Sequence, residues 1–165
     1  MKKFKNDNKG FTLVEMIVVL VILAILAAIL VPALLGYIDE AKQKQYVLDG
    51  KSCYTSAQAV MSDLYAKTTG GAPADIANAP YNTKVITMAD VDSKCKSLVV
   101  GYSGSAYDNT KSKSSQHSCF TISYVAYTAT DGTTVYLYNG SWEVLATDPA
   151  TSDSSLNKIT IRAAS

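Results

Sequence analysis

The sequence predicts an α+β fold in which a long N-terminal helix packs, by its C-terminal half, against a small antiparallel β-sheet. Three observations lead to this prediction: an uncharged apolar run at residues 16–35, an amphipathic helical pattern at 53–64, and β-rich runs separated by turn signals from residue 119 onward. The chain has 165 residues, of which 18% are charged, and its formal net charge is +1, so it has room for about one domain.

The apolar run is long enough to span a membrane. Its 20 residues, at about 1.5 Å each, extend about 30 Å as a helix, which is the thickness of a bilayer's hydrocarbon core. Four lysines and one aspartate precede it, so the positive-inside rule places the N-terminus in the cytoplasm and the remainder outside. An ordinary secretory signal peptide fits less well, because its apolar region spans only about 7–15 residues and is followed by a cleavage site.

The helix is expected to continue well beyond the membrane. Its amphipathic stripe consists of Cys53, Ala57, Val60 or Met61, and Leu64. The turn residues 68–71 supply a stop signal near Lys67, which gives a helix of about 55 residues and about 80 Å. Pro32 removes one backbone hydrogen bond from the apolar half and predicts a kink there, close to Gly36.

The segment after the helix is expected to begin with a loop at residues 68–86, which is rich in Gly and Pro. A capping-box pattern from Thr87 to Asp90 then predicts a short helix at 88–97, with a strand at 97–102 as the alternative. The apolar positions that favour the helix are Met88, Val91, Cys95 and Leu98.

The clearest β signal follows a polar loop at residues 103–117. Asp131-Gly132 lies between two β-rich runs, as in a type I′ hairpin, and Asn139-Gly140 supplies a second turn. We therefore expect three or four antiparallel strands over the second half of the helix. The predicted strands are 119–130, 133–138, 142–146 and 158–162.

The residues that carry a specific function lie at the start of the apolar run, in the order Lys9-Gly10-Phe11-Thr12-Leu13-Val14-Glu15. An ionised carboxylate inside a membrane segment costs about 2.5 kcal/mol or more unless it is paired, so Glu15 is a functional candidate. A side chain that merely reaches toward the lipid headgroups would also be tolerated, but this explanation does not account for the short basic leader.

Residues 1–40 closely resemble the N-terminal cleavage and methylation segment of the type IV prepilin family. The resemblance implies a pilin-like fold, cleavage between Gly10 and Phe11 by a prepilin peptidase, and N-methylation of Phe11. It also implies that Glu15 pairs with the Phe11 amine of a neighbouring subunit and sets the axial register during assembly. In the family the region around Pro32 can unwind within the filament, so a kink and local unwinding are both open for this chain.

The resemblance divides the chain into a cleaved leader at residues 1–10, a transmembrane and filament-core half-helix at 11–35, and a globular pilin head at 36–165. It implies a structural subunit, not an enzyme, of a type IV pilus used in adhesion, motility or surface attachment. Before assembly the protein would be a single-pass protein of the cell membrane with its head outside, and afterwards part of an extracellular homopolymer. Its expected partners are the peptidase, other pilin subunits and an inner-membrane assembly platform with an ATPase.

Two other functions stay open. The first is a pseudopilin or minor pilin of a type II secretion-like or competence DNA-uptake machine, which would share the fold. The second is a membrane-tethered binding domain that never polymerises.

Three cysteines lie in the part of the chain that is expected to be exported, where disulfides are permitted and an odd count leaves one thiol over. The resemblance favours Cys95–Cys119, which matches the surface disulfide loop of many pilins. Cys53–Cys119 and no bond at all are the alternatives, because spacing alone does not fix the geometry.

The sequence predicts no cofactor and no metal site. His117 is the only histidine, and the chain shows no phosphate-binding loop, carboxylate pair or nucleophile elbow. The acidic loop 148–153 lacks the dense ligand spacing of a calcium site. No basic stripe indicates a nucleic-acid partner for the subunit itself.

Overall fold

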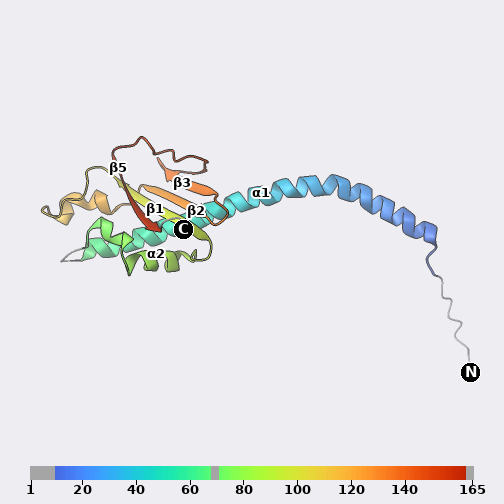
Figure 1. The fold of residues 1–165 in the computed structure, drawn as a ribbon, viewed down its shortest axis with the longest axis horizontal. Helices are drawn as coiled ribbons and strands as arrows, with labels where there is room; N and C mark the ends of the chain where they lie inside the picture. The colour runs from blue at the N-terminus through green and yellow to red at the C-terminus, as the bar shows by residue number, and fades with distance from the viewer. Residues whose placement is uncertain (1–9, 68–70, 163–165) are drawn as a thin grey trace, which may run out of the picture. The chain divides into compact units, whose positions relative to one another are not determined.

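The computed structural model describes residues 10–67 and 71–162 (Figure 1). Its first element is helix α1, Leu13–Ala66, which is 54 residues long and confirms the predicted length and end point. Residues 68–70 of the predicted stop signal lie outside the described residues. The chain divides into two compact units, Met1–Ala41 and Lys42–Ser165.

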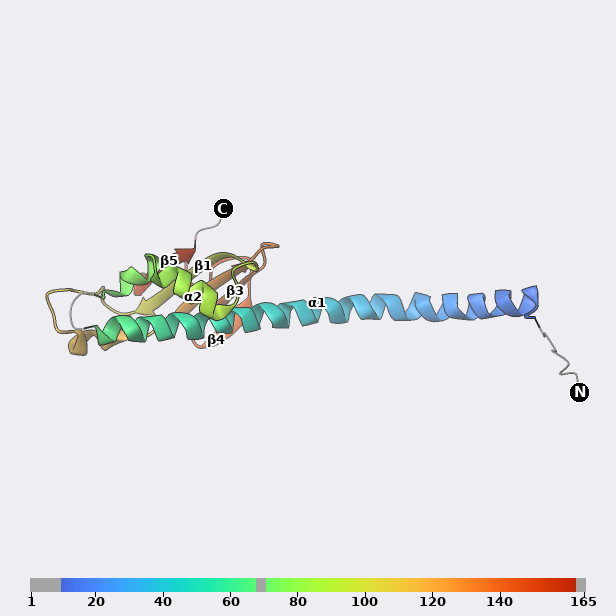
Figure 2. The ribbon, with the colours of Figure 1, turned by 90° about the horizontal axis from the view of Figure 1, so that it is seen from below.

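The second half of α1 supplies one wall of the hydrophobic core. The predicted stripe is confirmed, since all its members are fully buried: Cys53, Ala57, Val60, Met61 and Leu64. They belong to one core cluster with buried residues of the strands, among them Leu98, Val125 and Tyr127. The second half of α1 runs along the sheet (Figure 2). This apolar contact with the sheet, more than intrinsic helix propensity, stabilises the C-terminal half of such a helix.

The C-terminal end of α1 is capped from a distant part of the chain. The Lys113 ammonium donates to the carbonyl oxygens of Leu64 and Lys67, at 2.8 Å each. The last carbonyls of an α-helix lack the usual partner four residues on, and here the Leu64 carbonyl accepts only a long bond of 3.4 Å from the Lys67 N–H within the described backbone. A cation at this end also interacts favourably with the helix dipole.

The segment after α1 differs from its prediction. A 3₁₀ helix, η1 at Pro73–Ala77, and helix α2 at Tyr81–Ala89 replace most of the expected loop. The predicted helix at 88–97 is wrong, because Asp90 adopts a left-handed conformation (φ 54°) and ends α2. The residues Thr87–Asp90, which were expected to start a helix, therefore lie at the C-terminal end of one. The signals that were missed are Pro80 immediately before the helix and the buried residues Val85, Ile86 and Ala89.

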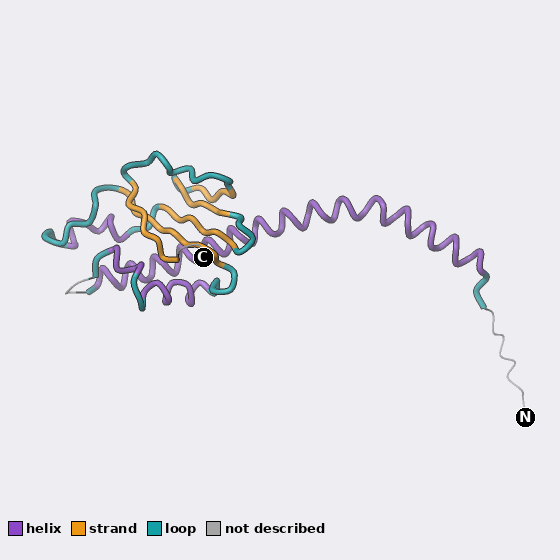
Figure 3. The backbone as a smooth tube through the Cα atoms, viewed as in Figure 1, coloured by secondary structure: helices purple, strands orange, loops and turns teal. Residues whose placement is uncertain are grey.

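The alternative strand at 97–102 is correct, and it forms the centre of a larger strand, β1, at Cys95–Ser103. A second 3₁₀ helix, η2 at Lys113–Phe120, occupies the end of the predicted loop and the start of the predicted strand 119–130. The remaining strands are β2 (Tyr124–Ala129), β3 (Thr134–Tyr138), β4 (Ser141–Val144) and β5 (Leu156–Arg162). The described sheet therefore has five strands, in the order β4-β3-β2-β1-β5 with antiparallel pairing throughout (Figure 3).

The predicted type I′ turn occurs at the second hairpin, not the first. Asn139 and Gly140, between β3 and β4, both have positive φ angles of 50° and 80°, as a type I′ turn requires. In the β2–β3 connection only Gly132 has a positive φ, and its N–H donates to the Ala129 carbonyl, as in a type I turn followed by a left-handed glycine. Asp131 in this connection accepts a hydrogen bond from the Tyr46 hydroxyl, which links the hairpin to α1.

Gln58 holds the connection between η2 and β2 against α1. Its side-chain amide donates to the Phe120 carbonyl at 2.9 Å and accepts from the Ile122 N–H at 2.8 Å. The Gln58 amide therefore satisfies two backbone groups that lie between η2 and β2, outside the strand ladders.

Close approach of α1 to β4 depends on Gly50. A Cβ atom on Gly50 would lie 2.8 Å from the Trp142 ring, which also packs edge-to-face against Tyr54 with ring centroids 6.5 Å apart. We predict that Gly50→Ala displaces the indole and destabilises the head by about 1 kcal/mol net, because overpacking outweighs the gain in helix propensity. Trp142 is the only tryptophan in the chain, so its emission spectrum and the melting temperature report this change directly.

Gly36→Ala is the matched control. It makes the same change in the same helix, but apart from the nearby helix backbone nothing in the described chain lies within 4 Å of the added Cβ. The control should leave Trp142 emission unchanged, and an equal spectral shift in both variants would contradict the prediction.

Candidate functional site

The start of α1 is built as a capping box. Thr12 precedes the first helical residue, and Glu15 Oε2 accepts hydrogen bonds from the Thr12 N–H and the Thr12 hydroxyl, both at 2.7 Å. The Glu15 N–H lies 3.3 Å from the Thr12 hydroxyl oxygen and donates to it in return. A threonine followed by a glutamate three positions later is the sequence signature of this motif, and sequence analysis missed it here.

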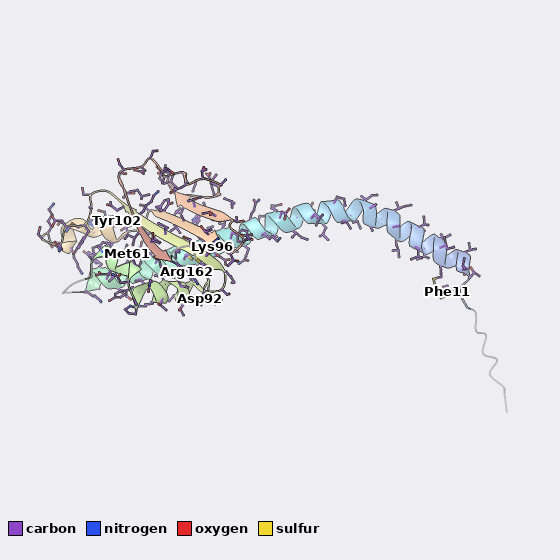
Figure 4. All side chains as sticks on the ribbon, viewed as in Figure 1. Phe11, Met61, Asp92, Lys96, Tyr102 and Arg162 are labelled. Atoms are coloured by element: carbon purple, nitrogen blue, oxygen red, sulfur yellow. The ribbon has the colours of Figure 1, made fainter. Side chains whose placement is uncertain are left out.

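The capping contact engages only one oxygen of the Glu15 carboxylate. Among residues 10–67 and 71–162, no hydrogen bond to Glu15 Oε1 is found, and a carboxylate has capacity for several donors. Phe11, immediately before the cap, is 80% exposed and lies beside the start of α1 (Figure 4). The arrangement can therefore cap its own helix and still accept a cation through Oε1.

The helix surface that follows Glu15 is apolar and uncovered. The large apolar side chains from Phe11 to Ile38 are 42–80% exposed. By length and composition, α1 is the one helix among the described residues that could cross a membrane. An exposed apolar surface of this extent requires lipid or other protein around it.

Pro32 lies inside α1, and the helix continues through it without interruption. At Gly36, an added Cβ atom would meet no other part of the described chain within 4 Å, so side-chain packing places no restraint on the helix there. Unwinding of this region in a polymer stays a prediction.

The cysteines do not form the expected bond. All three are free and buried: Cys53 in α1, Cys95 at the start of β1, and Cys119 in η2. Cys119 Sγ donates to the Ser105 carbonyl, beyond the far end of β1, and a strand of this length separates its ends by about 26 Å. A disulfide needs Cα atoms within about 7 Å, so the Cys95–Cys119 prediction is corrected.

The thiols of Cys53 and Cys95 should be unreactive in the folded protein. Burial raises the pKa of Cys53 to about 12, with a smaller contribution from the neighbouring Cys95, and burial raises the pKa of Cys95 to about 11. Because the thiolate is the reactive form, we expect slow alkylation of Cys53 and Cys95 by iodoacetamide at pH 8 in the native state. Mass spectrometry should then find three alkylated cysteines after denaturation without a reductant, and a requirement for prior reduction would contradict the free-thiol arrangement.

The carboxylates of the acidic loop are engaged by the protein itself. Lys158 Nζ and the Ala150 N–H donate to Asp148, at 2.6 Å and 2.9 Å, and the Tyr138 hydroxyl donates to Asp153 at 3.1 Å. Burial of Asp148 opposes its ionisation, but the hydrogen bonds from Lys158 and the Ala150 N–H hold its pKa below the ordinary value. Among the described residues, three or more His, Cys, Asp or Glu side chains nowhere cluster closely enough to hold a metal ion.

Comparison with known proteins supports the assignment of the N-terminal segment. Residues 5–31 match the family model of the prokaryotic N-terminal methylation motif. The chain is 37% identical over 113 residues to the type IV wide pilus major component PilA4 of Thermus thermophilus, covering 60% of this chain and 77% of that protein.

Two further relatives match over smaller parts of the chain. The type IV major pilin protein PilA of Myxococcus xanthus is 32% identical over 78 residues, which is 44% of this chain and 36% of that protein. The type II secretion system core protein G of Vibrio cholerae is 51% identical over 49 residues, which is 30% of this chain and 33% of that protein. No solved structure matches the chain significantly.

Proposed function

This chain belongs to the type IV pilin family, and from that premise we propose that it is a structural subunit that polymerises through α1 into an extracellular pilus. The observation that carries the proposal is the exposed apolar surface from Phe11 to Ile38, which begins at a capped carboxylate. In the membrane, lipid covers this surface. In a filament, copies of the same helix cover it.

Cleavage between Gly10 and Phe11 creates the cation that this arrangement can use. The peptidase removes the basic leader and leaves a free amine on Phe11, which is then methylated and keeps its positive charge. Glu15 Oε1 accepts from the Phe11 amine of a neighbouring subunit, while Oε2 continues to cap its own helix. A charge-assisted pair of this kind is roughly twice as strong as a neutral hydrogen bond.

The pair selects the register of each added subunit more than it stabilises the polymer. In a dehydrated filament core, the desolvation of two charges offsets much of their attraction. A subunit that docks out of register leaves both charges unpaired, and such a mismatch is heavily penalised. An inner-membrane platform with an ATPase would supply the work of extracting the helix from the bilayer.

A pseudopilin of a type II secretion-like or DNA-uptake machine is the second candidate, favoured by the 51% identity to core protein G over 49 residues. Because that match is confined to about a third of each protein, it does not separate the two functions. Electron microscopy of cells producing the protein separates them: long surface filaments support the pilus, and their absence in a processed, membrane-retained protein supports the pseudopilin.

The proposed processing is tested by mass spectrometry of filaments sheared from the cell surface. We expect a subunit that lacks residues 1–10 and carries one added methyl group at Phe11. A full-length, unmethylated chain that stays in the membrane would instead support a tethered binding domain that never polymerises.

A further inference from the structure

The head contains a cavity of about 470 Å³ at one end of the sheet, well away from the assembly segment in sequence. It lies between α1 and the ends of four strands, and the buried side chains of Ile122 and Leu137 form part of its lining. Its volume falls within the range of about 300–1,000 Å³ that is usual for small-molecule sites. All its lining residues belong to the unit Lys42–Ser165.

Three aromatic side chains from different elements line this cavity: Tyr54 from α1, Tyr138 from β3 and Trp142 from β4. Each is half-buried, so part of each ring remains accessible. Trp142 is held by Gly50 and by its edge-to-face contact with Tyr54, which fixes the ring without covering it. Within the described part of the chain, no group accepts a hydrogen bond from the Trp142 indole N–H. Because no buried side-chain donor among the described residues lacks a partner, this N–H is accessible from solvent.

Neutral polar side chains complete the lining. The Ser103 and Ser123 hydroxyls lie 2.8 Å apart, and Asn139 projects from the type I′ turn between β3 and β4. Asp153 is the one charged residue among the described lining residues, and its carboxylate already accepts from Tyr138 and Ser155. The cavity therefore combines accessible aromatic rings with several hydroxyl and amide groups.

We propose that this cavity binds a neutral saccharide in its pyranose form. One face of a pyranose ring presents C–H groups that pack on an aromatic ring, and its hydroxyls match the serine, asparagine and indole donors and acceptors. A purely apolar ligand would desolvate the Asn139 amide and the Trp142 indole N–H without offering them partners. An anion would meet Asp153 with no lysine or arginine among the described lining residues. The inference does not depend on polymerisation.

The chain offers a direct probe of this site, because its only tryptophan lines the cavity. Full-length protein in a phosphocholine detergent, which carries no sugar headgroup, is titrated with neutral pyranoses while Trp142 emission is recorded. Sorbitol serves as an open-chain polyol without a ring face, and spermidine as a cation. We expect a saturable change with at least one pyranose, half-complete at about 0.1–10 mM as befits a small polar ligand, and none with sorbitol.

Two variants make the assignment specific. Asn139→Gly with Ser123→Ala removes an amide and a hydroxyl while glycine keeps the positive φ that the turn requires, and it should weaken binding about tenfold or more. Asn109→Gly, an exposed asparagine outside the cavity, is the matched control and should bind as the unsubstituted chain does.

The proposal is overturned if no pyranose gives a saturable change up to about 0.1 M, a concentration that would fill most of a site with a millimolar dissociation constant. It is also overturned if sorbitol matches the pyranoses, if spermidine alone saturates, or if the double variant binds unchanged.

Discussion

Replacing Glu15 with alanine should reduce surface filaments at least tenfold while leaving cleavage at Gly10–Phe11 intact. The substitution leaves the Phe11 amine of a neighbouring subunit buried without a partner, which costs about 3–5 kcal/mol in a dehydrated environment. Since about 1.4 kcal/mol is a factor of ten in an association constant, each added subunit would bind more than about a hundredfold more weakly. Filament yield is measured by shearing and quantitative immunoblotting, and cleavage by the mass of the membrane-bound pool.

Two matched variants separate the pairing role of Glu15 from its capping role. Glu15→Gln keeps an oxygen that can accept from Thr12 but removes the charge, and we expect it to fail in assembly as the alanine variant does. Thr12→Val removes the capping hydroxyl, keeps the shape and leaves Glu15 charged, so it should still assemble. Normal filaments from Glu15→Gln would show that capping, not charge, is what assembly needs.

Replacing Gln58 with alanine should lower the free energy of unfolding of the head by about 2–6 kcal/mol. The amide satisfies the Phe120 carbonyl and the Ile122 N–H, and each buried backbone group left without a partner costs about 1–3 kcal/mol. Thermal and denaturant unfolding in the same detergent, followed by circular dichroism and by Trp142 emission, measures the loss.

Gln43→Ala is the control for this prediction, because Gln43 is an exposed glutamine in the same helix. The change in helix propensity is the same at both positions, so Gln43→Ala should alter stability by no more than about 0.5 kcal/mol. Equal stabilities of the two variants would mean that water replaces the Gln58 amide without loss.

The parts of the fold that follow from local pattern were predictable. The uncharged run, the buried stripe from Cys53 to Leu64 and the turn residues that follow each act over a few neighbouring positions, and they correctly located α1. The β2–β4 meander was likewise visible from its β-rich runs and Gly-containing turns. The prediction of the family rested on residues 1–40, where a short basic leader, the Gly10-Phe11 junction, Glu15 and the unbroken apolar run follow one another along the chain.

The errors arose where tertiary contacts decide between local alternatives. Met88, Val91, Cys95 and Leu98 have helical spacing, but Asp90 adopts a left-handed conformation and the later residues pair with β2 and β5 instead. Cys95 and Cys119 are separated by the length of β1, which no spacing rule reveals. Gln58 and the saccharide cavity depend on residues that the fold brings together from distant segments, so neither has a local signature.

The central claim is that Glu15 pairs with the processed N-terminus of a neighbouring copy. A cryo-electron microscopy reconstruction of the sheared filaments tests it most directly. We expect the Phe11 amine nitrogen of one subunit to lie about 2.7–2.9 Å from a Glu15 carboxylate oxygen of the next, with Thr12 still bound to the other oxygen. A filament in which Glu15 contacts only its own Thr12, with the neighbouring Phe11 amine elsewhere, would contradict the account.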